Sequence, residues 1–433
     1  MRFLSHFSMA IALASVGALA VAALPQEAQA AKKKKKEKKS EIEISKEIRP
    51  RVAEIQAAMA TETPETAKPL VEALLAETLA PDDRFIAGQL AVQLGGTLKD
   101  VSLQEKGIIA SLDSGRTSPE QLPAFNFFAG NFAYSAERWA EAAQRFQAAY
   151  DLGYRANNIE ALLPETFFKR NMYPEGLAKW DQIIRNANAS TTKAPESWYR
   201  MARDRALASK NLDFYSAWAA RWASAYPSGD SWGDAVAASR RTSQSDSVQN
   251  LEVLRFMKAT GALKTARDYK EFAEEAQRKN LFGEVVAVLE DGQQKGLIGS
   301  SHPLVAELLT PARREVSADR ASLPSQPSGV RGSGSSSVMM NYGDVWLGYK
   351  DFDKAVAFYE AGLSKPGADM DRGYMGVGTA HAYAGNVAAA KQAFARVSGT
   401  RAPLAEMWKT WINQQAAPAA PAAPTVAVAE PTT

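Results

Sequence analysis

The segment 126–154, NFFAGNFAYSAERWAEAAQRFQAAYDLGY, decides the fold of this chain. Its apolar residues recur at spacings of three and four, the period of an amphipathic helix. The apolar stripe breaks once, around 135–138, so the segment predicts two short helices joined by a tight polar turn. Neither helix could bury its apolar stripe alone, so each needs the other and a neighbouring pair.

The same pattern returns along the chain. In 126–154 a small residue, an aromatic and a second small residue stand at Ala142, Phe146 and Ala149, and Gly130 lies twelve positions before the first of them. A glycine there lets two helices approach closely, despite its cost of about 1 kcal/mol within a helix. In the first recurrence Pro164 takes the place of this glycine. The recurrences are Gly176, Trp180 and Ile183; Ala355, Tyr359 and Gly362; and Ala390, Phe394 and Val397, with Gly343 and Gly378 ahead of the last two.

These units resemble tetratricopeptide repeats, helix–turn–helix modules with a period of about 34 residues. The best matches are 126–154, 339–363 and 372–397, and weaker ones are 162–184 and 272–292. The resemblance implies an all-α solenoid of stacked helix pairs that binds protein or peptide partners on its concave face, which the first helix of each unit lines. By that resemblance the face would hold Asn131, Tyr134, Glu165, Tyr199, Arg203, Lys270, Glu274, Asp344 and Arg372. The proline that the family carries near the end of each unit is mostly missing here, which leaves the pitch of the superhelix undetermined.

Residues 1–30 have the pattern of a secretory signal peptide. Arg2 precedes an apolar run from Met9 to Leu24, and Ala28-Gln29-Ala30 fits the small-x-small rule for cleavage after Ala30. The run is shorter than the roughly 20 residues of a spanning helix, although an uncleaved anchor in the inner membrane is the alternative. We therefore expect a bacterial periplasmic protein.

A lysine-rich block follows the signal-like segment. Seven lysines fall within 32–39, a block that repels itself and that could adhere to an anionic envelope surface. The slightly acidic remainder and the expected compartment make nucleic acid a poor partner. The expected organisation is a signal peptide (1–30), a Lys-rich disordered leader (31–45), an N-terminal helical region (46–115), TPR-like repeats (116–310), a Pro/Gly/Ser-rich linker (311–337), a C-terminal repeat pair (338–415) and a disordered Ala/Pro tail (416–433).

Composition excludes several kinds of chemistry. The 433 residues include no cysteine and three histidines, so thiolate catalysis and Cys-containing metal sites are out, and a histidine site has few ligands to draw on. The phosphate-loop, dinucleotide, zinc-protease and nucleophile-elbow motifs are missing. The paired acids lie in charged stretches that are typical of solvated helix faces. We expect no catalytic residues, cofactor, metal or small-molecule substrate.

The stretch 198–222, which contains WYRMARDR and WAARW, is the most distinctive interior feature. Trp218 and Trp222 lie on one helical face, and they belong either to a core or to an exposed surface, where Trp and Arg dominate binding energy. Two functions remain open. The favoured one is an exported scaffold that binds protein segments in its groove. The alternative is an accessory factor held at the cell wall or envelope surface by the Lys-rich leader and this aromatic/Arg patch.

Overall fold

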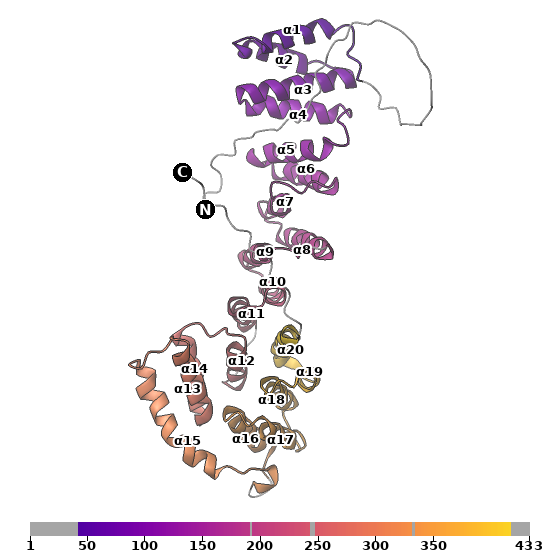
Figure 1. Cartoon of the computed structure of the whole chain (residues 1–433). Helices are drawn as coiled ribbons and strands as arrows, with labels where there is room; N and C mark the ends of the chain where they lie inside the picture. Colours follow the sequence, from indigo (N-terminus) through magenta and orange to yellow (C-terminus); the bar gives the residue numbers. More distant parts are fainter. Residues whose placement is uncertain (1–41, 191–192, 243–246, 331–333, 417–433) are drawn as a thin grey trace, which may run out of the picture. The chain divides into compact units, whose positions relative to one another are not determined.

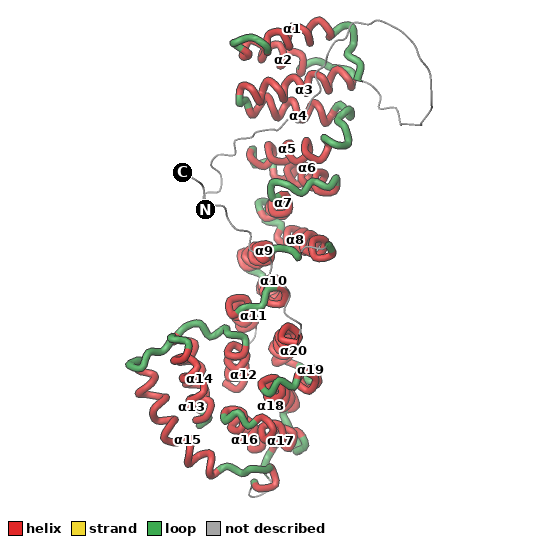
Figure 2. Tube along the Cα trace, viewed as in Figure 1, coloured by secondary structure: helices red, strands yellow, loops and turns green. Residues whose placement is uncertain are grey.

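The computed structural model describes residues 42–190, 193–242, 247–330 and 334–416 (Figure 1). Across these ranges every regular element is helical, with 20 α-helices and short 3₁₀ and π turns (Figure 2). The all-α prediction is therefore confirmed. The expected signal peptide, the lysine run and the tail after residue 416 lie outside the described residues. No helix among those described is long and apolar enough to cross a membrane.

The chain divides inside helix α8, between Ile183 and Ile184, into two compact units. The first unit contains α1 (Arg49–Met59), α2 (Ala67–Leu75), α3 (Pro81–Leu98), α4 (Val101–Asp113), α5 (Leu122–Ser135), α6 (Trp139–Asp151), α7 (Ile159–Phe168) and the larger part of α8 (Tyr173–Ala189). The second unit contains α9 (Glu196–Ala208), α10 (Leu212–Ala225), α11 (Gly229–Thr242), α12 (Ser247–Ala259), α13 (Ala266–Arg278), α14 (Phe282–Gln294), α15 (Thr310–Ser322), α16 (Ser336–Gly348), α17 (Phe352–Leu363), α18 (Met370–Tyr383), α19 (Val387–Phe394) and α20 (Ala402–Ala416).

Consecutive helices pack as antiparallel pairs, and the pairs α5–α6, α16–α17 and α18–α19 are those that the repeat pattern predicts. A Cβ atom placed on Gly130 of α5 would lie 2.6 Å from Cδ1 of Phe146 on α6. The same clash arises between Gly343 and Tyr359 and between Gly378 and Phe394. The predicted close approach is confirmed, because in each pair the glycine makes room for an aromatic ring on the second helix.

The pair α7–α8 departs from the glycine rule. Pro164, which replaces the glycine, is buried within α7. Gly176 on α8 makes room for a ring instead, since its Cβ would lie 2.5 Å from Cε1 of Phe168 on α7. The small residue and the ring have exchanged helices, and their contact lies where the end of α7 meets the start of α8.

Two apolar clusters join the helices α1 to α5 of the first unit. One joins α1, α2 and α3 through residues such as Ile55, Leu74 and Leu94, and the other joins α3, α4 and α5 around Ile108 and Phe132. The helical character expected for 46–115 is therefore present in α1 to α4.

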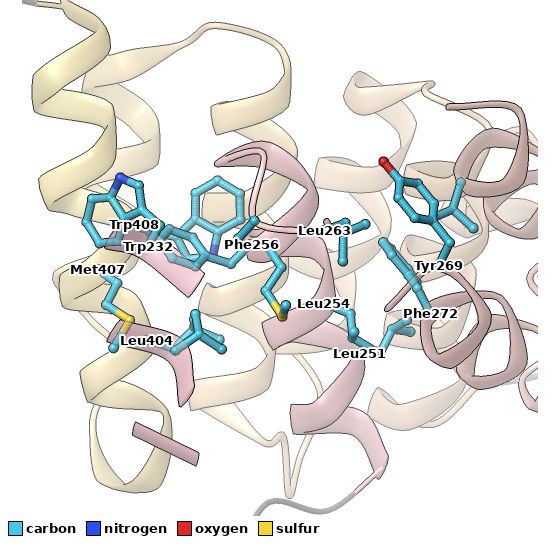
Figure 3. Packing of buried hydrophobic residues seen from close by; sticks show 14 of the residues in the cluster. Trp232, Leu251, Leu254, Phe256, Leu263, Tyr269, Phe272, Leu404, Met407 and Trp408 are labelled. Atoms are coloured by element: carbon cyan, nitrogen blue, oxygen red, sulfur yellow. The ribbon is translucent and has the colours of Figure 1, made fainter. Parts of the chain in front are cut away.

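Within the second unit the helices do not form a simple linear stack. Helix α16 contacts α14, and α20 contacts α10, so the C-terminal helices pack back against the middle ones (Figure 1). Rings from three helices meet in this core, with Phe256 on α12 edge-on to both Trp232 on α11 and Trp408 on α20 (Figure 3). Helix α15 occupies the first part of the range 311–337, where a linker is expected, and Ala312 in its first turn is buried. Apolar contacts of this kind allow a helix where composition alone suggests a loop.

Candidate functional site

The second unit has a hollow of about 510 Å³ between α9 and α11. Part of its wall comes from the end of α10 and from the turn that joins α12 to α13. It is lined by Glu196, Arg200, Arg203, Trp222, Ser228, Gly229, Asp230, Gly233, Asp234, Ala237, Ala262 and Lys264. Two neighbouring helices and the nearby turn thus offer three basic and three acidic side chains to one concave surface.

Trp222 is the aromatic residue of the hollow and is 4% exposed. Its indole N–H donates to Oε1 of Glu196 at 2.9 Å, which fixes the ring against α9. The guanidinium of Arg203 lies 5.1 Å from the ring centroid and that of Arg200 lies 5.7 Å from it. Cations at such distances are attracted to the ring face. Trp222 is therefore a buried core residue that also lines the hollow. The 198–222 stretch thus combines the aromatic core and the aromatic/Arg surface that the sequence left as alternatives.

Arg203 and Asp234 hold α9 and α11 together. Nε of Arg203 lies 3.1 Å from Oδ2 of Asp234, and Oδ1 of Asp234 accepts a hydrogen bond from the Tyr215 hydroxyl at 2.9 Å. Burial raises the pKa of Tyr215 to about 12, and the neighbouring carboxylate adds to that shift, so the hydroxyl stays a donor. These three side chains are committed to the framework of the site.

The remaining charges of the hollow are better placed for a ligand. Arg200 is exposed, and its contact in the described structure is with the Trp222 ring. Lys264 and Asp230 are 3.4 Å apart, but both side chains are more than half exposed, so their pairing contributes little. Gly229 on α11 approaches the carbonyl oxygen of Gly261 so closely that a Cβ there would have no room. That approach brings the turn carrying Lys264 to the edge of the hollow.

The nine residues expected on a concave face fall in both units. Asn131, Tyr134 and Glu165 lie on α5 and α7 of the first unit and are all partly exposed. In the second unit, Arg203 alone of the nine lines the hollow. Tyr199, one turn earlier, is buried, and its hydroxyl accepts from the Asn188 side chain at 2.8 Å.

The other four residues form two pairs. Lys270 and Glu274 make an ion pair of 3.7 Å with both side chains largely exposed on α13. Asp344 and Arg372 are joined at 2.7 Å, and Asp344 is buried. The structure thus brings together Asp344 with Arg372 and Lys270 with Glu274, whereas Tyr199 contributes to the core.

Sequence reasoning missed most of the hollow's lining. Glu196, Asp230, Asp234 and Lys264 stand in segments without repeat consensus, and Lys264 belongs to a turn. One available signal was the Gly229/Gly233 pair on one face of α11, since small residues four apart allow close helix approach. Among the described residues, no group of three or more His, Asp or Glu side chains could hold a metal ion.

No protein-family model and no curated protein sequence matches the chain. Among solved structures the chain is similar to one described as Naa15/Naa10 bound to HypK-THB, with 12% sequence identity and a TM-score of 0.36. That alignment covers 86% of this chain and 61% of the other. This degree of likeness says nothing about a partner or an activity.

Proposed function

We propose that this chain is an exported, non-catalytic helical-repeat scaffold whose α9–α11 hollow binds an extended segment of a protein or peptide partner. Helix-pair repeats expose surfaces that are formed before a partner arrives, so little ordering cost is incurred on binding. Export is proposed from the pattern of residues 1–30 alone.

The hollow is the observation that carries the proposal. Trp222 supplies a rigid aromatic wall, and Arg200 and Lys264 at its edge can donate to carboxylates or backbone carbonyls of a bound segment. Trp and Arg are the residues that most often dominate binding energy at protein interfaces. The framework charges, Arg203 and Asp234, are already paired and keep the wall in place.

A second candidate function is an accessory role at the envelope surface, with the lysines of 32–39 adhering to anionic polymer. The exposed guanidinium of Arg200 favours it in part, because a cation at the edge of the hollow also attracts anionic polymer. Purified cell-wall sacculi distinguish the two functions. A glycan binder would sediment with them, whereas a peptide binder would stay in the supernatant.

Selection of random-sequence peptides against the chain that begins at Ala31 tests the favoured function. We expect selected peptides to bind the wild-type protein and to lose affinity for Arg200→Glu, which reverses one charge of the hollow. Arg267→Glu is the matched control, since Arg267 is exposed on α13 outside the hollow. Failure to select any peptide, or equal losses of peptide affinity in both variants, would show that the hollow is not a peptide-binding site.

A further inference from the structure

Helix α12 carries two buried charges of opposite sign, Glu252 and Arg255, one turn apart. Their exposed fractions are 7% and 3%. Each meets a partner from the C-terminal helices: Arg255 contacts Asp344, 89 residues away, and Glu252 contacts Arg401, 149 residues away. The two contacts fasten the C-terminal part of the second unit to its middle.

The Arg255 contact is fully paired. Its Nε and Nη2 donate to the two carboxylate oxygens of Glu284 on α14, each at 2.8 Å, and Nη1 donates to Asp344 on α16 at 2.8 Å. Asp344 also accepts from Arg372 at 2.7 Å and from the Tyr359 hydroxyl at 2.8 Å. Two guanidiniums therefore face two carboxylates here.

The Glu252 contact is unbalanced. Nε of Arg401 lies 3.0 and 3.1 Å from the two oxygens of Glu252, and Nη1 of Arg401 lies 3.6 Å from Oδ2 of Asp369. One guanidinium is thus shared between two carboxylates. Over both contacts the ion pairs join three guanidiniums to four carboxylates. Lys258, further along α12, lies outside these ion pairs, and its Nζ is 3.4 Å from the carbonyl oxygen of Ala287.

The charged groups around Glu252 come from each element packed against it. They are Arg255 on α12, Asp344 on α16, Arg372 on α18, Arg401 after α19 and, through Arg401, Asp369 at the start of α18. Burial raises the pKa of Glu252 to about 7, the attraction of Arg401 and Arg255 opposes that rise, and repulsion from Asp344 adds to it. The hydrogen bonds among the described residues show the same difference: Glu252 accepts from one N–H group, Nε of Arg401, whereas Glu284 accepts from two donors and Asp344 from three. The buried carboxylate with the fewest donors is where a proton is most readily taken up.

We propose that the docking of the C-terminal helices on α12 is linked to a proton on Glu252. The helices are held more tightly when Glu252 is neutral, and the contact loosens when Glu252 ionises. When the C-terminal helices undock from α12, the Glu252 side chain is exposed to water, and its ionised form then carries no desolvation penalty. This device goes beyond partner binding in the hollow and does not depend on it.

The direction and the size of the pH dependence of docking follow from the linkage between docking and proton binding. In an undocked state Glu252 would have its ordinary pKa of 4.5, so the docked state binds the proton more tightly. Docking is then favoured as pH falls, and it should be roughly tenfold weaker at about pH 8 than at about pH 6. Above its raised pKa the buried carboxylate is charged, and the docked state carries the part of the desolvation penalty that Arg401 and Arg255 do not offset.

Hydrogen exchange of the full chain at these two pH values measures the effect, with rates corrected for the intrinsic pH dependence of exchange. We expect amides of α20 to lose about tenfold in protection at the higher pH. Amides of α3 and α4, in the other unit, are the internal reference. Equal protection of α20 at both pH values, after correction, would overturn the proposal.

Variants assign the effect to Glu252. Glu252→Gln imitates the protonated side chain and should make α20 protection independent of pH. Asp369→Asn removes a half-exposed carboxylate whose pairing with Arg401 contributes little, so most of the pH dependence should remain. Glu274→Gln, on the exposed face of α13, should behave as wild type. Persistence of the wild-type pH dependence in a folded Glu252→Gln, or its loss in Asp369→Asn, would contradict the assignment.

Discussion

Arg255 and Asp344 are 89 residues apart in the sequence, and their side chains meet at 2.8 Å in the interior of the second unit. The pair joins a helix from the middle of the chain to the first helix of the C-terminal repeats. Charges buried to this degree are stable only when their partners are present. The pair is therefore kept only while the last repeats stay packed on α12 and α14.

Asp344→Asn should therefore be strongly destabilising. It removes the charge shared by Arg255 and Arg372 and leaves the buried Arg255 with a single carboxylate partner. We expect the free energy of unfolding of the second unit to fall by about 3 kcal/mol or more. Urea denaturation followed by tryptophan fluorescence measures it. Glu274→Gln, which breaks an exposed pair, should cost less than about 1 kcal/mol, and similar losses in both variants would contradict the role given to Asp344.

The buried Asp344 carboxylate should also make the stability of the second unit depend on pH in the acid range. Burial pushes its pKa upward, but Arg255 and Arg372 outweigh burial, so the pKa lies below its ordinary value of 3.8. A lowered pKa stabilises the fold at pH values above 3.8, and this contribution is lost as pH falls through the folded pKa. Acid titration of stability should show this loss in wild type. Asp344→Asn should lack it, and an unchanged acid profile in that variant would be inconsistent with the pairing.

The glycine–aromatic contact of the repeats gives a test within one unit. Gly130→Ala would force a Cβ against Phe146, and we expect a loss of stability of about 1–3 kcal/mol. Gly96→Ala, near the end of α3, meets no atom within 4 Å and should be neutral or stabilising by up to about 1 kcal/mol, since alanine favours a helix. Thermal unfolding of the two variants compares them directly. A stabilised Gly130→Ala would show that close approach does not set the packing of α5 on α6.

Export is tested by expressing the full chain in a bacterium and sequencing the N-terminus of the protein from the periplasmic fraction. The small-x-small site predicts Ala31 as the first residue. A full-length chain in the membrane fraction would favour the anchor, and a full-length chain in the cytosol would reject export.

Deleting 32–39 should reduce sedimentation with anionic vesicles if the lysines adhere to an envelope surface.

Local features of the fold were predictable from the sequence. The spacing of Gly343 and Tyr359 predicts a helix pair because both residues lie within one repeat, and their packing depends on helix geometry alone. Arg203, placed on a concave face by the resemblance to tetratricopeptide repeats, lines the hollow between α9 and α11; whether that surface binds a partner stays a prediction.

Long-range features were not predictable in the same way. Nothing near Glu252 or Arg401 indicates that they meet, because their pairing depends on how the helices of the whole second unit pack. Asp344 was expected to face an open groove. In the structure it is buried, and Arg255 of α12 donates a hydrogen bond to it. Helix α15 lies in a stretch whose composition suggests a linker, and it forms against α14 and the π turn Val305–Leu309 that precede it.

Hydrogen exchange of the full chain with and without the tightest selected peptide locates the bound segment on the protein. If the hollow is the binding site, the peptide should add protection in α9, in α11 and in the turn that carries Lys264, and that protection should be lost in Arg200→Glu. Protection confined to the first unit, or protection that survives unchanged in Arg200→Glu, would contradict a partner-binding site in the α9–α11 hollow.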